Sequence, residues 1–289
     1  MSWKESVLIS LKTALNAPVE LISTSTVGGG DINDAYQFNT SEGRFFVKKN
    51  SASRFPKMFE KEALGLKLLL DTGEIPVPEV VTFDETEDTA FLVLKFIESA
   101  AKSHGFWDDF GERLAALHRH SNDWFGLDHD NYMGSLFQSN KKHDRWTDFF
   151  REERLNVQVK MARDSGNMGR DVVQAFERFY SRLDEIFPVE PPALVHGDLW
   201  GGNYMVNEQG DAVIIDPAVY YGSREMDIGM SILFGGFSGE FYDAYNEYYQ
   251  LQPGWQKRVD YCNLYPLMVH VNLFGGGYLQ SVKSILRKF

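Results

Sequence analysis

The sequence predicts an α+β fold in which a strand-rich N-terminal part precedes a mostly helical C-terminal part. Between residues 21 and 96, short apolar segments alternate with turn residues, and from residue 103 onward apolar residues recur at helical spacing. The 289 residues are 43% hydrophobic and 14% aromatic, enough for one large domain or two packed lobes. This composition excludes a disordered chain, although it would equally fit an ordinary α+β domain without a site.

The charge balance limits the classes of partner. With 29 Lys and Arg against 41 Asp and Glu, the net charge is −12, which disfavours sequence-independent nucleic-acid binding and suits a cationic partner. The longest apolar candidate for a membrane segment, Ala90 to Ile97, is interrupted by Lys95, and the charged N-terminus has no secretory core. We therefore expect a soluble cytoplasmic protein with no nucleic-acid or membrane partner and an open oligomeric state. The single cysteine, Cys262, is expected to pack in the core.

The N-terminal part begins with a helix over residues 3–15, for which Ser2 and Glu5 form a capping box. A second helix, about residues 56–70, should bury Phe59, Ala63, Leu66 and Leu70 on one face. Turn residues divide the remaining apolar segments into five predicted strands, at 21–25, 34–39, 44–49, 80–84 and 89–96.

The C-terminal part is predicted to be helical with one β interruption. The interruption is a hairpin of residues 204–207 and 212–216, joined by a turn at 208–211. The helical patterns fall at about 103–120, 146–163, 168–187, 225–233, 238–250 and 254–285. We place the lobe boundary in the connector Lys95–Ala100, with an N-terminal nucleotide-binding lobe at 1–97 and a catalytic and substrate lobe at 98–289.

The segment from Leu194 to Asn203, LVHGDLWGGN, carries the strongest chemical signal. It precedes the predicted hairpin, whose second strand ends in Asp216. Asn203 and Asp216 offer the oxygen ligands that Mg²⁺ takes together with nucleotide phosphates. Asp198 lies five residues before Asn203 and could orient an acceptor hydroxyl, as in the kinase pattern of Asp, four residues, Asn and a later metal-binding Asp.

The N-terminal part supplies candidates for the nucleotide phosphates. Gly28, Gly29 and Gly30 lie between strands, where missing side chains would let backbone N–H groups approach phosphates, although three glycines are also common in simple turns. Lys48 ends the apolar strand FFVK, like the strand lysine of kinases, and Lys49 should face the other side. We choose Glu62 of the next helix to orient Lys48, with Glu60 as the alternative.

At this point the chain resembles the fructosamine kinase (ketosamine-3-kinase) family, a branch of the aminoglycoside-phosphotransferase-like kinases. The similar stretches are HGDLWGGN (196–203), IIDPAVYYGSREMDIGM (214–230) and FGGF (234–237), with VGGGDINDAY (27–36), FFVKKN (45–50), FEKEALGLKLL (59–69), LAALHR (114–119), FGLDHDNYMGSLFQSN (125–140) and WTDFFREERL (146–155). The resemblance therefore runs along nearly the whole chain and implies a bilobal protein-kinase-like fold.

The resemblance implies a role for each matching position. Asp198 would be the catalytic acid/base position, Asn203 and Asp216 would bind Mg²⁺, and Lys48 with Glu62 would position the phosphates of ATP. The connector Lys95, Phe96 and Ile97 would meet adenine through backbone groups. Family members phosphorylate the sugar 3-hydroxyl of ketosamines, the adducts of glucose or ribose with an amine or lysine, which supports deglycation. Some relatives carry a redox-active cysteine in the glycine-rich loop, and this chain has none there.

Substrate contacts are less direct. Trp200 could stack on sugar, Asp227 could meet the secondary ammonium of the substrate, and Trp146 begins a helix of the C-terminal part. Each has a structural alternative, and for Asp227 we favour capping of the helix near residues 224–226. We expect His196 to brace its loop and His118 to lie in the core or at an interface.

Two other functions stay open. The shared motif also occurs in small-molecule kinases of the aminoglycoside or choline type, and a catalytically silent nucleotide-binding scaffold would keep the same fold. The sequence does not separate free from protein-bound substrates, or fructosamine from ribulosamine adducts.

Overall fold

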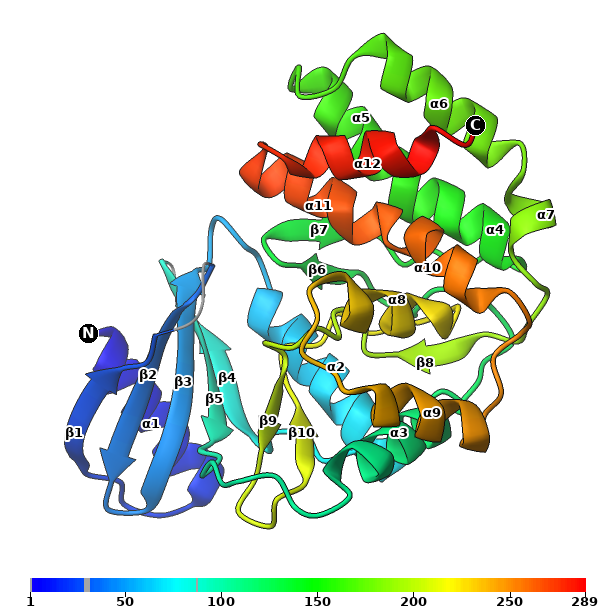
Figure 1. The fold of residues 1–289 in the computed structure, drawn as a ribbon. Helices are drawn as coiled ribbons and strands as arrows, with labels where there is room; N and C mark the ends of the chain where they lie inside the picture. Colours follow the sequence, from blue (N-terminus) through cyan, green and yellow to red (C-terminus); the bar gives the residue numbers. More distant parts are fainter. Residues whose placement is uncertain (1, 29–31, 87) are drawn as a thin grey trace. The chain divides into compact units, whose positions relative to one another are not determined.

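The computed structural model describes every residue except 1, 29–31 and 87, and the chain forms two compact units (Figure 1). Unit 1 comprises residues 1–106 and 204–217, and unit 2 comprises residues 107–203 and 218–289. The chain therefore leaves unit 1, builds much of unit 2, returns for one hairpin, and then completes unit 2. The functional division at residue 97 stays a prediction.

An antiparallel five-stranded sheet in the order β1-β2-β3-β5-β4 forms the centre of unit 1. The five strands predicted from the sequence are confirmed to within about two residues at each end. Their bounds are β1 Leu21–Thr26, β2 Asp34–Thr40, β3 Gly43–Ser51, β4 Val80–Glu85 and β5 Thr89–Lys95.

Two helices cover opposite faces of this sheet. Helix α1, Trp3–Leu15, has the predicted capping box and packs its Val7 and Leu11 onto one face. Helix α2, Met58–Thr72, packs Phe59, Ala63 and Leu66 onto the other. The two cores separate cleanly because successive side chains of β3 and β5 point to opposite faces.

One expected core position of α2 is wrong. Leu70 is half exposed, and Leu69 is buried in its place at 1% exposure. Both residues lie within the angular range that helical spacing allows from Leu66, three and four positions away. The pattern alone could not distinguish them, and the fold buries Leu69.

The hairpin of β9, Tyr204–Val206, and β10, Ala212–Ile214, belongs to unit 1. Backbone hydrogen bonds attach it there, from Ile214 to Pro76, from Ala100 to Val206, and from Ser103 to Gly210. The register pairs Tyr204 with Ile214, so the chain enters and leaves the hairpin at the same end. Along the chain, Asn203 directly precedes the first strand of the hairpin, and Asp216 comes two residues after the last.

Unit 2 is mostly helical, as predicted, but its helices are more divided. The predicted helix at 254–285 is three helices, interrupted at Asn263 and again at Gly275–Gly277, where Gly275 and Gly276 have left-handed φ values. The helices are α3 Phe106–Leu117, α4 Trp146–Phe149, the π-helix η1 Phe150–Leu155, α5 Asn156–Asp164, α6 Arg170–Tyr180, α7 Leu183–Ile186, α8 Glu225–Leu233, α9 Gly239–Tyr248, α10 Trp255–Cys262, α11 Leu264–Phe274 and α12 Tyr278–Leu286.

Two small β pairs in unit 2 were not predicted. Strand β6, Asn131–Met133, pairs with β7, Leu136–Gln138, and β8, Ala193–Val195, pairs with β11, Tyr220–Gly222. Each strand has three residues, too few to show the alternation on which sequence assignment depends. The β8–β11 pair places the segment before the HGD motif beside the segment that follows Asp216-Pro217.

Candidate active site

Lys48 brings two carboxylates together in unit 1. Its Nζ lies 2.7 Å from Oε1 of Glu62 on α2 and 2.6 Å from Oδ1 of Asp216, which follows β10. The Lys48 and Glu62 side chains are 6% and 11% exposed, whereas the Asp216 side chain is 45% exposed. The cluster therefore joins a buried ion pair to one carboxylate that remains accessible.

The strand alternation explains why Lys48 and not Lys49 occupies this position. Phe45 and Val47 belong to the core on the α1 face, so Lys48 points to the α2 face and meets Glu62. Lys49 points the other way, where its Nζ lies 2.7 Å from Asp34. The expected separation of the two lysines is confirmed.

The electrostatics of the cluster keep Lys48 charged. Burial disfavours the ammonium, but the carboxylates of Asp216 and Glu62 outweigh burial and raise the pKa of Lys48 above its ordinary value. The structure pairs Glu60 with Lys57, 3.4 Å apart, so Glu62 is the partner of Lys48 among the two candidates. Lys48 is thus a fixed cation with a defined orientation.

Asp216 has the features of a Mg²⁺ ligand. Its backbone is in the left-handed region, at φ 56°, a conformation that is unfavourable for a residue with a side chain and that is concentrated at functional sites. One carboxylate oxygen contacts Lys48, and within the described chain the other accepts no hydrogen bond. A hard, accessible carboxylate oxygen suits Mg²⁺.

The structure describes Gly28 of the glycine-rich segment and the whole connector Lys95–Ile97. Gly28 is exposed, and a side chain there would meet no atom within 4 Å, while Gly29 and Gly30 lie outside the described residues. In the connector, the amide of Lys95 donates to Glu79 and that of Phe96 donates to Arg44. A backbone donor for adenine would therefore have to come from Ile97.

The HGD loop in unit 2 holds Asp198 and Asn203 in contact. The Asn203 amide nitrogen donates to the backbone oxygen of Asp198 at 2.9 Å and to its Oδ2 at 3.0 Å. The Asn203 backbone N–H closes a turn onto Trp200. Because its nitrogen faces Asp198, the orientation of the Asn203 amide is fixed, and within the described chain its Oδ1 accepts no hydrogen bond. That oxygen could therefore coordinate a metal ion.

Gly197 is required by its surroundings. Its φ is +84°, and a Cβ there would lie 2.2 Å from the carbonyl oxygen of Ala218. The amide of Ala218 also donates to the carbonyl oxygen of His196 at 2.9 Å. The segment after Asp216-Pro217 thus packs directly against the backbone before Asp198.

The structure corrects both expectations for Asp227. Its side chain is fully buried, accepts the backbone N–H groups of His196 at 2.7 Å and Gly197 at 2.9 Å, and lies 3.2 Å from His118 Nε2. Burial would raise the pKa of Asp227, but its hydrogen bond with His118, the nearby imidazoles and the Gly197 amide together lower it. Asp227 therefore neither caps its own helix nor faces a substrate, because its oxygens are committed to the loop.

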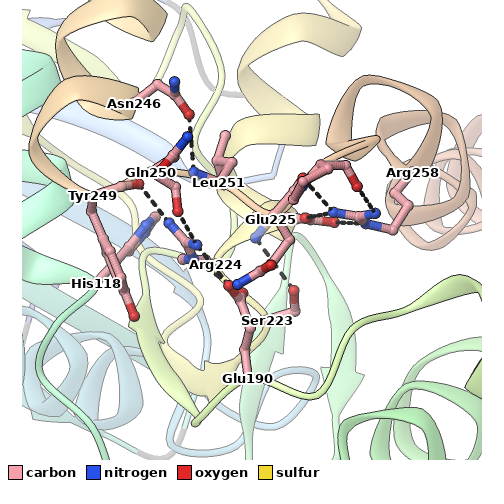
Figure 2. A network of polar contacts seen from close by, with 12 residues as sticks. His118, Glu190, Ser223, Arg224, Glu225, Asn246, Tyr249, Gln250, Leu251 and Arg258 are labelled. Carbon is pink, nitrogen blue, oxygen red and sulfur yellow. Dashed lines mark hydrogen bonds and ion pairs between the residues drawn. The ribbon is translucent and has the colours of Figure 1, made fainter.

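Two buried ion pairs fix the start of α8, the helix that carries Asp227 (Figure 2). Arg224 makes a bidentate pair with Glu190, and Arg258 makes one with Glu225. Arg224 also donates to the carbonyl oxygens of Tyr249 and Gln250. These bonds restrain the backbone on either side of residue 225 and so the position of Asp227.

The two tryptophan candidates differ. Trp200 is 38% exposed, meets Phe234 edge-on at 6.1 Å, and lies over Gly202, where a Cβ would come within 2.3 Å of its ring. Part of the Trp200 ring is therefore accessible to a ligand. Trp146 is 6% exposed and stacks on Phe150 at 5.1 Å, so it is a core residue and not a substrate contact.

The expectations for the histidines and Cys262 are confirmed. His196 is fully buried, and its Nδ1 accepts the Asp198 amide at 3.3 Å, which braces the loop. His118 is buried and joins Tyr245 to Asp227. The His118–Asp227 contact is not predictable from the sequence, since a histidine among apolar residues gives no sign of a partner 109 positions away. Cys262 is buried in α10.

Comparisons with known proteins agree with this geometry. A family model described as fructosamine kinase matches residues 3–289. The chain belongs to the fructosamine kinase family. A probable ketoamine kinase of Synechocystis is 37% identical over 285 residues, covering 98% of this chain and 96% of that protein. The chloroplastic protein-ribulosamine 3-kinase of Arabidopsis thaliana is 38% identical, covering 92% and 82%. The prediction that the chain is a phosphotransferase is thereby confirmed.

Solved structures confirm the fold. A candidate fructosamine-3-kinase of Thermobifida fusca has a TM-score of 0.88 at 32% identity, covering 98% of this chain and 97% of that one. The aminoglycoside phosphotransferase APH(4)-Ia has a TM-score of 0.66 at 14% identity and supports the kinase-like fold alone. Within the described part of this family member, no helix is both long and apolar enough to span a membrane.

Proposed function

We propose that this family member transfers the γ-phosphoryl group of ATP to the sugar 3-hydroxyl of ketosamines, the fructosamine or ribulosamine adducts of amines and lysine. Phosphorylation would destabilise the adduct and support deglycation of small molecules, peptides or proteins. The names of the relatives, ketoamine kinase and protein-ribulosamine 3-kinase, support this substrate class. We further propose that the protein works in the cytoplasm.

The observation that carries the proposal is that the residues of the kinase pattern are already oriented by one another. Lys48 is held between Glu62 and Asp216, and Asp198 contacts Asn203. Oriented groups of this kind lower the barrier to phosphoryl transfer, which depends mainly on positioning and on charge stabilisation.

Each residue has a proposed task. Lys48 would neutralise phosphate charge, and Asp216 with Asn203 would hold Mg²⁺ through carboxylate and amide oxygens. The metal ion, when bound, supplies charge neutralisation at the phosphates. Asp198 would accept the proton of the 3-hydroxyl and aim its oxygen at the phosphorus. Gly28 and Ile97 are the described positions of the glycine-rich segment and connector that could offer backbone groups to ATP, and Trp200 would stack on the sugar.

The test is ATP-dependent phosphorylation of ribulosyl-lysine and fructosyl-lysine, measured side by side. We expect transfer to at least one adduct and a loss of about 1,000-fold or more in turnover for Asp198→Asn, with ATP affinity nearly unchanged, since this residue acts on the acceptor. Transfer to neither adduct, with turnover of an aminoglycoside or choline, would favour the first alternative function. ATP binding without any transfer would favour the silent scaffold.

A further inference from the structure

Arg154 is a buried cation. Its side chain in η1 is 0% exposed, and no carboxylate of the described residues pairs with it. The other buried arginines of unit 2, Arg224 and Arg258, both have bidentate glutamate partners, as Figure 2 shows. Burying a guanidinium without an opposite charge is unfavourable unless other groups compensate.

The compensation comes from ring faces and from oxygen atoms. The Arg154 guanidinium lies 4.0 Å from the ring centre of Tyr220, and 4.4 Å from that of Phe149. Its nitrogens donate to the carbonyl oxygen of Ser139 at 2.6 Å and to Oδ1 of Asn140 at 2.7 Å. The charge is thus used to fix the segment that follows β7.

From Asn140, a chain of amide hydrogen bonds leads back toward the HGD loop. The Asn140 amide donates to Asn131 Oδ1 at 2.9 Å, and the Asn131 amide donates to the carbonyl oxygen of Val219 at 2.9 Å. The Gln138 amide donates to Asn131 Oδ1 at 2.7 Å and to the carbonyl oxygen of Ala218 at 3.1 Å. The β6–β7 hairpin therefore holds two consecutive carbonyl groups just after Asp216-Pro217.

Ala218, the first of these two residues, is in direct contact with the loop of Asp198. The Ala218 amide bonds to His196, and its carbonyl oxygen occupies the space where a side chain on Gly197 would lie. Tyr220, which stacks on Arg154, is also next to Gly197, since a Cβ there would lie 3.3 Å from its ring. A shift of residues 218–220 would therefore displace the backbone before Asp198.

We propose that Arg154 is a positioning residue for Asp198, acting through Asn140, Asn131 and Gln138 on residues 218–220. The inference rests on the proposed phosphoryl transfer, because the position of Asp198 matters for that reaction. This role requires the forked guanidinium, because two of its nitrogens donate at the same time to the Ser139 carbonyl oxygen and to the Asn140 side chain. A residue that only filled the core would not need a charge at this place.

The test compares three variants at a temperature where each is fully folded. Arg154→Met keeps the length and removes every donor, while Arg154→Lys keeps the charge and loses the fork. Phe176→Leu, in the core of α6, is the control for loss of stability alone. The first readout is kcat together with KM for ATP and for ketosamine. The second is the amide hydrogen exchange of residues 196–200 and 218–220, a measurement that needs no substrate.

We expect Arg154→Met to lower kcat about 10- to 100-fold with KM for ATP within about threefold, since a displacement of about 1 Å can cost 100-fold in rate. Amide hydrogen exchange at residues 196–200 and 218–220 should be at least about tenfold faster than in the wild type. Arg154→Lys should keep more than half of the fall in kcat and more than half of the rise in exchange rate, both compared on a logarithmic scale. Phe176→Leu should change neither readout by more than about twofold.

Unchanged exchange at both segments in Arg154→Met, or equal acceleration in Phe176→Leu, would overturn the positioning role. If Arg154→Met does not fold, Tyr265→Phe tests the same chain, because its hydroxyl donates to Gln138 Oε1 at 2.7 Å. That variant should accelerate exchange in the same two segments by about threefold or more, and no acceleration would again overturn the role. If the wild type phosphorylates no ketosamine, the proposed function fails, while exchange still decides whether Arg154 supports the loop.

Discussion

Replacing Asp227 with Asn tests whether this buried carboxylate holds the loop of Asp198. The substitution keeps the size of the side chain but turns one of two acceptor oxygens into a donor. Because Asp227 accepts the amides of His196 and Gly197, one of these N–H groups would face an NH₂ group. Asp227→Asn should therefore leave at least one buried donor without an acceptor.

The size of the effect follows from these bonds. A hydrogen bond to a charged group contributes about 1.5–3 kcal/mol, and a buried unsatisfied donor costs about 1–3 kcal/mol. We expect the free energy of unfolding to fall by about 3 kcal/mol, which lowers the melting temperature by about 5 °C for a protein of this size. Turnover should fall about 10-fold or more, because the loop carries Asp198.

The pH dependence gives a sharper check. The pKa of Asp227 is lowered in the folded protein, so its contribution is complete above the unfolded value of about 3.9 and is lost as pH falls through the folded value. The difference in melting temperature between wild type and Asp227→Asn should be constant from about pH 8 to pH 5 and shrink below about pH 4. Differential scanning fluorimetry across this range measures it.

A matched control is Asp243→Asn, on the exposed side of α9 in the same unit. It should change the melting temperature by less than about 2 °C. A shift for Asp227→Asn as small as that of the control would refute the argument that its two amide bonds hold the loop. So would a difference that grows as the pH falls below 4.

Three further predictions use pairs of similar residues or a single exposed ring. Lys48→Met should lower kcat/KM for ATP about 100-fold, since it removes the phosphate cation, whereas Lys49→Met on the other face should stay within about twofold; equal losses would remove Lys48 from this role. Gly197→Ala should destabilise the protein by more than about 2 kcal/mol in chemical denaturation because its Cβ meets a carbonyl oxygen, while Gly73→Ala, also at positive φ but in open space, should cost about 1 kcal/mol. Trp200→Ala should raise KM for the ketosamine about 10-fold and leave the melting temperature within about 2 °C, and an unchanged KM would exclude stacking on the sugar.

The sequence by itself determined the features that depend on local pattern. Alternation along FFVK assigned Lys48 and Lys49 to opposite faces, and the capping box located the start of α1. The spacing of Asp198, Asn203 and Asp216 indicated a kinase before any contact was known. These inferences work because strand period, cap chemistry and motif spacing are properties of neighbouring residues.

Only the tertiary structure decided the features that depend on distant partners. Asp227 has the same place in the first turn of a helix as an ordinary capping acid, yet its partners lie about 30 residues before it. The burial of Trp146 and of Arg154 likewise depends on residues that pack around them from distant parts of the chain. Burial and long-range hydrogen bonds fix these roles, and neither leaves a periodic signal in the chain.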